Sequence, residues 1–85
     1  MRIEVTQEDI ARGLPRAVDA CPVALAVKRA FLLSRTSVGS TAFTGPGGRR
    51  FALPAEATEF IRAFDKKLPV QPIAFDVDET LLVDD

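Results

Sequence analysis

The stretch that most constrains the fold of this chain is CPVALAVKRAFLL, residues 21–33. Only Lys28 and Arg29 are charged in it, and the other residues are apolar apart from Pro22. A surface helix would carry a polar stripe on its outer side, so a segment this apolar predicts a helix covered over most of its circumference. Pro22 suits the first helical position, where its missing N–H would have no partner. We therefore predict that this helix is the core element, and it is too short to cross a membrane.

The residues before this helix predict a strand followed by a short helix. Residues 2–5 alternate polar and apolar side chains, as a half-buried strand does. The Thr6 hydroxyl can cap a helix over residues 7–12, two acidic residues in the first turn match the helix dipole, and Gly13 is a typical stop. The residues from Leu14 to Ala20 fit either a helical turn or an irregular connection.

The second half of the chain predicts a hairpin, a helix and a last strand. Residues with high strand propensity flank Gly45-Pro46-Gly47-Gly48, which is the strongest turn signal in the chain. Apolar residues are available for the covered faces of this hairpin: Val38, Phe43, Phe51 and Leu53. Residues 55–68 return to helical spacing, Pro69 prevents continuation, and residues 73–77 form a strand. The apolar face of this helix is predicted to comprise Ala57, Phe60, Ile61, Phe64 and Leu68.

These elements predict a small α+β domain with the order β-α-α-β-β-α-β, a mostly antiparallel sheet and helices on one face. The sequence does not determine the strand order. Eighty-five residues support a single domain, residues 1–85, with a modest core, so we expect homo-oligomerisation to add stability. The hydrophobic content of 47% argues against disorder, and a net charge of −1 predicts no general attraction to nucleic acid or to an anionic membrane.

Several kinds of chemistry are excluded by composition. One cysteine cannot form an internal disulfide, and without histidine the chain lacks a usual zinc ligand and an imidazole base for a catalytic triad. We therefore expect no metal site, no cofactor and no enzymatic activity. Cys21 is interpreted as a small buried residue, with a reactive thiol at the helix start as the alternative. The lone thiol and an acidic N-terminal segment that does not resemble a signal peptide predict the cytosol.

The candidate binding site lies in a cationic segment in the middle of the chain. No acidic residue occurs between Ala20 and Ala55, and the Gly-rich turn offers backbone N–H groups without side-chain obstruction. Guanidinium groups suit phosphate or carboxylate, hydroxyl groups add hydrogen bonds, and an exposed Phe43 or Phe51 could stack on a base. The candidate ligand-binding residues are Lys28, Arg29, Arg35, Ser37, Thr41, Phe43, Arg49 and Arg50.

Simpler interpretations of the same residues remain open. The basic residues of the hairpin are also explained as solvated side chains that protect its strand edges, and strand alternation would place Arg49 and Arg50 on opposite faces. Lys28 and Arg29 are explained by the helix dipole alone. The solvated hairpin is favoured in an isolated monomer, whereas two packed copies could enclose an anionic ligand.

A second motif lies at residues 73–82, IAFDVDETLL. It resembles the first motif of the haloacid-dehalogenase-like phosphatases, in which an apolar strand ends in D-x-D-x-T. That resemblance implies a nucleophile at Asp76, a general acid/base at Asp78 and a bound Mg²⁺. Only seven residues follow Asp78, whereas that family continues with a long α/β domain. We therefore favour a strand that ends in solvated acids.

Three blocks together resemble a family of small proteins encoded by bacteriophages and their bacterial hosts. The blocks are VTQEDI with Gly13, CPVALA, and FIRAFD with Pro72 and Phe75. The resemblance spans most of the chain and carries no catalytic residue. It implies a phage accessory protein of the host cytoplasm, and some compact phage proteins are sponges that sequester nucleotide-like immune signals, which is an analogy of class only.

The sequence therefore predicts a non-enzymatic phage protein that sequesters a small anionic, nucleotide-like ligand as a homo-oligomer. The alternative is a phage module that inhibits a host protein through its acidic C-terminal residues, which would mimic nucleic acid. Those acids are Asp76, Asp78, Glu79, Asp84 and Asp85.

Overall fold

Strands β1 (Arg2–Val5) and β4 (Ile73–Asp76) pair antiparallel, although they lie at opposite ends of residues 1–78, the part of the chain that this computed structural model describes. Ile3 lies opposite Phe75 in the register of this pair, and both side chains are buried. The side chains that point the other way, such as Glu4, are exposed. One face of this sheet is therefore covered and the other is open.

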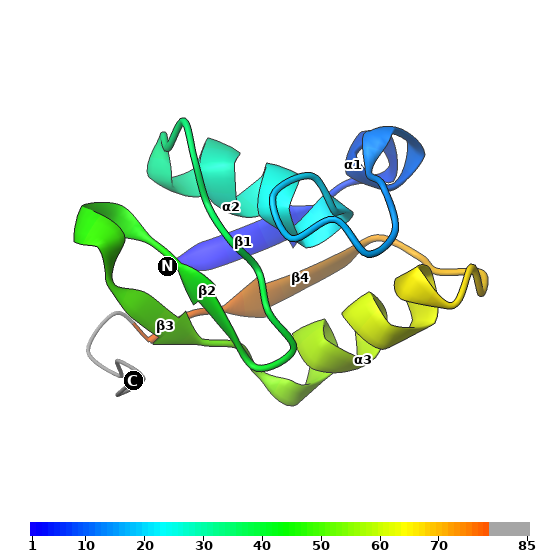
Figure 1. Ribbon diagram of the computed structural model, residues 1–85. Helices are drawn as coiled ribbons and strands as arrows, with labels where there is room; N and C mark the ends of the chain where they lie inside the picture. The colour runs from blue at the N-terminus through cyan, green and yellow to red at the C-terminus, as the bar shows by residue number, and fades with distance from the viewer. Residues whose placement is uncertain (79–85) are drawn as a thin grey trace.

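The covered face packs against two helices, α2 (Pro22–Phe31) and α3 (Ala55–Asp65), which flank the β1–β4 pair (Figure 1). α2 contributes most to the core, because Val23, Ala24 and Val27 are fully buried. The short helix α1 (Gln7–Arg12) packs against α2. The predicted α+β domain with helices on one face and a central apolar helix is confirmed. Within residues 1–78, no helix is long and apolar enough to span a bilayer.

The predicted hairpin forms a second antiparallel pair, β2 (Ala42–Thr44) and β3 (Arg50–Ala52), joined by a 3₁₀ turn, η1 (Pro46–Gly48). Phe43 lies opposite Phe51 across this pair, and Val38 forms an isolated bridge with Phe43 on the other side. All three side chains are buried, so this row closes the core beneath the hairpin. The antiparallel pairing expected from the sequence is thus divided between two small sheets.

Local signals determine where the helices begin. The Thr6 hydroxyl accepts a hydrogen bond from the Asp9 N–H, and the Asp9 carboxylate accepts one from the Thr6 N–H, which completes a capping box. Pro22 occupies the first position of α2, as predicted. The end of α3 differs from the prediction, because the helix stops at Asp65 and Lys67 has a φ of 62°. Leu68 therefore lies beyond the helix and is 53% exposed, so its placement on the apolar face was wrong.

Gly13 ends α1 for a steric reason and not for the conformational one expected from the sequence. Its φ is −67°, which any residue adopts, so no left-handed cap is formed. A Cβ atom built on Gly13 would instead lie 2.5 Å from Cδ of Pro22 and 2.7 Å from the Pro22 backbone nitrogen. A glycine is required at position 13 because the backbone at the end of α1 lies directly against Pro22 at the start of α2, which leaves no room for a Cβ atom.

We expect Gly13→Ala to lower the free energy of unfolding by about 2 kcal/mol, because the rigid proline ring and its backbone cannot move aside cheaply. Gly39→Ala is the matched control, since a Cβ there would meet its nearest atoms at 3.4 Å and 3.5 Å, in ordinary contact. Urea unfolding followed by circular dichroism measures both. Equal stabilities of the two variants would contradict the close approach of Gly13 to Pro22.

Candidate functional site

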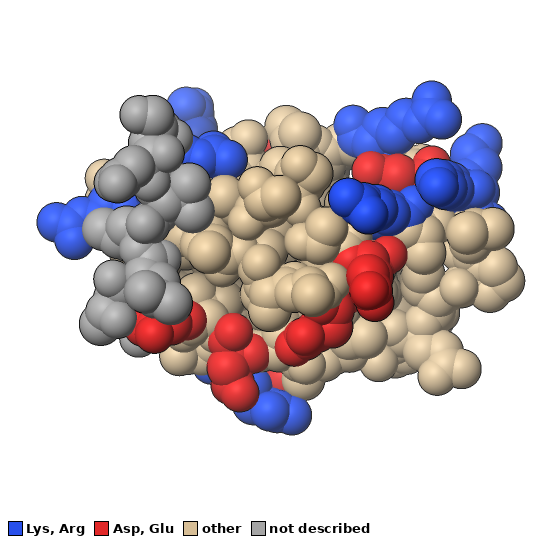
Figure 2. Space-filling model, turned by 90° about the horizontal axis from the view of Figure 1, so that it is seen from below, with Lys and Arg blue, Asp and Glu red and all other residues tan. Residues whose placement is uncertain are grey.

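Cationic side chains gather at two ends of the molecule. The hairpin lies at one end and the C-terminal end of α3 at the other (Figure 1), and Figure 2 shows basic side chains at both of these ends, with acidic side chains on the surface between them. Within residues 1–78, four guanidinium groups have no hydrogen-bond or ion-pair partner. They are those of Arg16, Arg35, Arg49 and Arg62.

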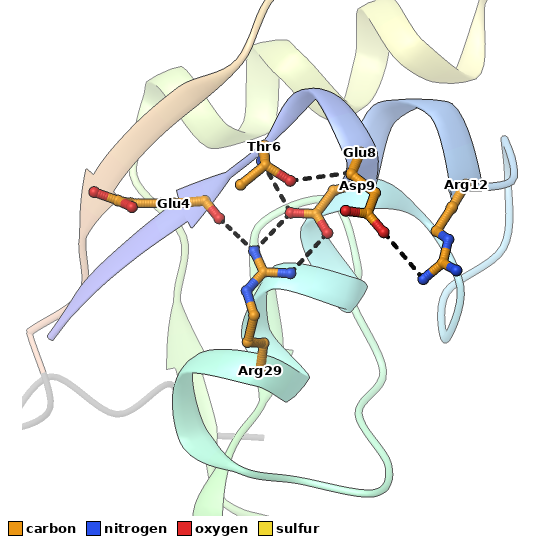
Figure 3. Close-up of polar contacts among 6 residues, drawn as sticks. All are labelled: Glu4, Thr6, Glu8, Asp9, Arg12 and Arg29. Carbon is orange, nitrogen blue, oxygen red and sulfur yellow. Dashed lines mark hydrogen bonds and ion pairs between the residues drawn. The ribbon is translucent and has the colours of Figure 1, made fainter.

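Two of the predicted cationic residues are engaged elsewhere in the fold. Lys28 donates a hydrogen bond from Nζ to the carbonyl oxygen of Asp19 at 3.0 Å. Arg29 reaches to the opposite side of α2 from the hairpin and binds Asp9 and β1 (Figure 3). These two side chains therefore connect α2 to its neighbours and are not brought together with the hairpin arginines.

Asp9 is a buried carboxylate that pairs with Arg29, whose own side chain is 53% exposed. Both Nη atoms of Arg29 donate to the two Asp9 carboxylate oxygens, at 2.8 Å and 2.7 Å, and one also donates to the Glu4 carbonyl oxygen at 2.9 Å. The Asp9 side chain is only 5% exposed. Burial raises the pKa of Asp9, but the hydrogen bonds from Arg29 and Thr6 and the positive charge of Arg29 outweigh burial, so the pKa lies below its ordinary value of 3.8.

The hairpin brings together some of the predicted ligand-binding residues. The Thr44 N–H donates to the Ser37 carbonyl oxygen, and Thr44 lies opposite Arg50, so Ser37, Thr44 and Arg50 form one row across three chain segments. This row alternates with the buried Val38, Phe43, Phe51 row and therefore lies on the outer face. One guanidinium nitrogen of Arg50 donates to the Thr44 hydroxyl oxygen at 3.4 Å.

Three further predicted residues occupy different positions around the hairpin. Arg35 and Arg49 are exposed, and both lie at the end of the hairpin that carries the Gly-rich turn. Thr41 is also exposed but lies at the opposite end of β2, where its carbonyl oxygen accepts a hydrogen bond from the Leu53 N–H. A single ligand at the turn would therefore contact the arginines and Ser37 more readily than Thr41.

The predicted aromatic contacts are not available on this surface. Phe43 is fully buried and Phe51 is 5% exposed, and their rings stack on each other at a centroid distance of 5.6 Å. The predicted stacking on a base would need an exposed ring, and neither phenylalanine provides one. Both phenylalanines therefore belong to the core, and the binding surface of the hairpin consists of arginine, hydroxyl and backbone groups.

The other groups considered for chemistry are placed as follows. Cys21 is buried as expected, and its Sγ accepts a hydrogen bond from the Ala24 N–H at 3.4 Å. Burial raises the pKa of this thiol, which disfavours a reactive thiolate. Asp76 ends β4 and is exposed, as is Asp78. Residues 79–85, with Glu79, Asp84 and Asp85 of the acidic segment, lie outside the described residues.

The sequence places the Thr44 hydroxyl on the strand that faces the arginines, and Thr44 lies opposite Arg50 in the outer row of the hairpin. One feature of the site was not identified from the sequence. Asp9 was assigned only to the helix dipole, and nothing in the local sequence indicates its ion pair with a residue on another helix. Among residues 1–78, no group of three or more acidic or thiol side chains is placed to hold a metal ion.

Comparisons with protein-family models, with characterised proteins and with solved structures find no significant match to this chain. Its function must therefore be inferred from its own residues and their arrangement.

Proposed function

We propose that this chain is a non-enzymatic phage protein that captures a small anionic, nucleotide-like ligand at the turn end of its hairpin and so acts as an anti-defence sponge in the host cytoplasm. The observation that carries the proposal is the outer row of Ser37, Thr44 and Arg50, flanked by the unpaired Arg35 and Arg49. Three positive charges and two hydroxyl groups therefore lie on or beside the outer face of the hairpin.

The chemistry of this surface suits phosphate. A guanidinium group can donate two parallel hydrogen bonds to phosphate oxygens, and these charge-assisted bonds are about twice as strong as neutral ones. Added Cβ atoms on Gly47 and Gly48 would meet no atom within 4 Å, so the turn backbone can be approached closely. A ligand with more than one phosphate could contact the row and the turn at the same time.

The proposal is non-enzymatic because the two buried groups that could take part in catalysis, the Asp9 carboxylate and the Cys21 thiol, are not available for it. The Asp9 carboxylate is held by Arg29 and by the Thr6 N–H, so it is not available as a general base. The Cys21 thiol is buried and its raised pKa keeps it protonated near neutral pH. The groups that remain accessible at the hairpin bind anions but do not transfer protons at neutral pH.

Oligomerisation forms part of the proposal, because an open hairpin alone would bind weakly. Exposed ion pairs and hydrogen bonds contribute little each in water, whereas two facing hairpins would exclude water and double the number of arginine contacts. Leu32, at the end of α2, is an apolar side chain with 91% exposure that a second copy could cover. Native mass spectrometry of the wild-type protein tests this expectation directly.

We expect the Arg49→Ala, Arg50→Ala double variant to lose the ligand. The protein is purified from cells that produce cyclic-nucleotide or ADP-ribose-derived immune signals, and native mass spectrometry then reports the oligomer and any bound small molecule. The identified compound is titrated by calorimetry, where loss of two charge-assisted contacts should weaken binding about 10- to 100-fold. Arg12→Ala is the matched control, because Arg12 is an exposed arginine paired only with Glu8 at 3.3 Å.

An unchanged affinity in the double variant would remove the hairpin assignment. A bare monomer from such cells would instead favour the alternative, a module that inhibits a host protein. The exposed acids Glu4 and Asp76 would serve this alternative from the open face of the β1–β4 sheet, where Arg2 pairs with Glu4 and lies opposite Asp76. Inhibition that survives neutralisation of the acidic C-terminal residues would then reject the nucleic-acid mimic.

A further inference from the structure

A cleft of about 330 Å³ lies between residues 16–21, residues 38–40 and α3, at the other end of the hairpin sheet from the Gly-rich turn. Its volume is at the lower end of the range for small-molecule sites. The hydroxyl of Thr58 donates to the Ser40 carbonyl oxygen at 2.9 Å, which holds the start of α3 against the 38–40 segment. Two walls of the cleft are therefore fixed to each other.

The inner surface of this cleft is apolar. It is lined by side chains from three separate segments, among them Ala17, Cys21, Val38 and Ile61. Cys21 and Val38 are 4% exposed, so the cleft reaches down to the edge of the core. An apolar group placed there would be removed from water without displacing any polar contact of the fold.

The rim of the cleft is cationic. Arg16 and Arg62 both line it, and they are two of the four guanidinium groups without a partner within residues 1–78. Asp65 also lines the rim, where its Oδ1 accepts a hydrogen bond from the Arg16 N–H at 2.9 Å. This bond holds Arg16 in a left-handed conformation, with a φ of 61°. Two arginines and one aspartate leave the rim with a net charge of +1.

We infer that this cleft is a second binding site, independent of the hairpin, for a small monoanionic amphiphile whose carboxylate or sulfonate lies between Arg16 and Arg62 and whose apolar body fills the cleft. The apolar lining selects against a polyphosphate, and the net charge of +1 matches a single negative charge. A neutral molecule of the same shape would leave both guanidinium groups without a partner. The site therefore discriminates by head-group charge.

A pair of fluorescent probes tests this assignment. 1-Anilinonaphthalene-8-sulfonate carries one negative charge, and N-phenyl-1-naphthylamine has the same rings without the sulfonate. The chain has no Trp or Tyr, so the protein adds little fluorescence of its own. We expect the sulfonate probe to bind wild-type protein with a 1:1 stoichiometry and at least about 10-fold more weakly to the Arg16→Gln, Arg62→Gln double variant. The affinity for the neutral probe should change less than twofold.

A thiol reaction locates the bound probe. Cys21 is the only cysteine of the chain and lines the cleft, so a saturating amount of the sulfonate probe should slow its labelling by a maleimide in wild-type protein. The same concentration should slow the labelling of the double variant less than that of wild-type protein. Circular dichroism confirms that the variant retains its fold before either measurement is interpreted.

Three results would overturn the inference: no saturable binding of the sulfonate probe, equal affinities in wild-type and double variant, or equal weakening by the control Arg12→Gln. The Arg49→Ala variant should bind the sulfonate probe as wild-type protein does, because Arg49 lies at the turn end of the hairpin. That result separates this cleft from the hairpin, so the failure of one site leaves the other unaffected.

Discussion

Phe43→Ala is expected to lower the free energy of unfolding by about 3–5 kcal/mol, the largest loss among the substitutions considered. The Phe43 ring is fully buried, with the Phe31 ring at a centroid distance of 6.1 Å and the Phe51 ring at 5.6 Å. Its removal leaves a cavity between α2 and the hairpin that neither neighbour can fill alone. Because small domains are stable by only about 5–15 kcal/mol, the variant should be partly unfolded at 37 °C.

Phe64→Ala is the matched control for this substitution. Phe64 is only partly buried and packs against Phe60 at a centroid distance of 6.3 Å, so its loss should destabilise the fold much less. Urea unfolding followed by circular dichroism gives both values. A Phe43→Ala variant that kept full stability but lost its ligand would contradict the core position and restore the stacking role that the sequence suggested.

Arg29→Met is expected to lower the free energy of unfolding by about 2–3 kcal/mol. The substitution keeps much of the apolar stem but leaves the Asp9 carboxylate, whose side chain is 5% exposed, without its charged partner. Although the Arg29 side chain is 53% exposed, its loss is destabilising because the Asp9 charge that remains is buried and poorly solvated. Arg12→Met is the control, since its exposed pair with Glu8 contributes at most about 1 kcal/mol.

The same pair predicts a pH dependence whose sign follows from the lowered pKa of Asp9. Because this carboxyl binds a proton less readily in the folded chain than in the unfolded chain, the pair contributes its full stability above the ordinary pKa of 3.8. The contribution is lost as the pH falls from there through the lower pKa of the folded state. The stability difference between wild-type and Arg29→Met should therefore shrink in acid, and a difference independent of pH would contradict this origin.

Features that depend on nearby residues were predictable from the sequence. The bounds of α1 were correct because the Thr6 cap and the adjacent acidic residues act within one helical turn. The hairpin was correct because Gly45, Pro46, Gly47 and Gly48 occur together. Leu68 shows the limit of periodicity, because its spacing fits the helix but the chain has already turned at Lys67.

Features that depend on distant residues could not be derived in this way. An arginine near the end of a helix fits the dipole whether or not a carboxylate faces it, so the bond between Arg29 and Asp9 was not visible in the sequence. The alternation of side chains in a short hairpin does not show which face meets the core. Phe43 was therefore a candidate both for the core, where it lies, and for stacking on a ligand. The cleft at Arg16 and Arg62 combines three segments, none of which is unusual by itself.

The pairing of β1 with β4 has a consequence for how this protein emerges from a ribosome. The N–H of Val77 donates to the Met1 carbonyl oxygen, so the sheet joins residues 76 positions apart in the sequence. The hairpin and the helices have local partners and can form as they are synthesised, whereas β1 must wait for β4. A nascent chain that has not yet released residues 73–76 therefore exposes Ile3 and Val5, which β4 helps to cover in the finished fold.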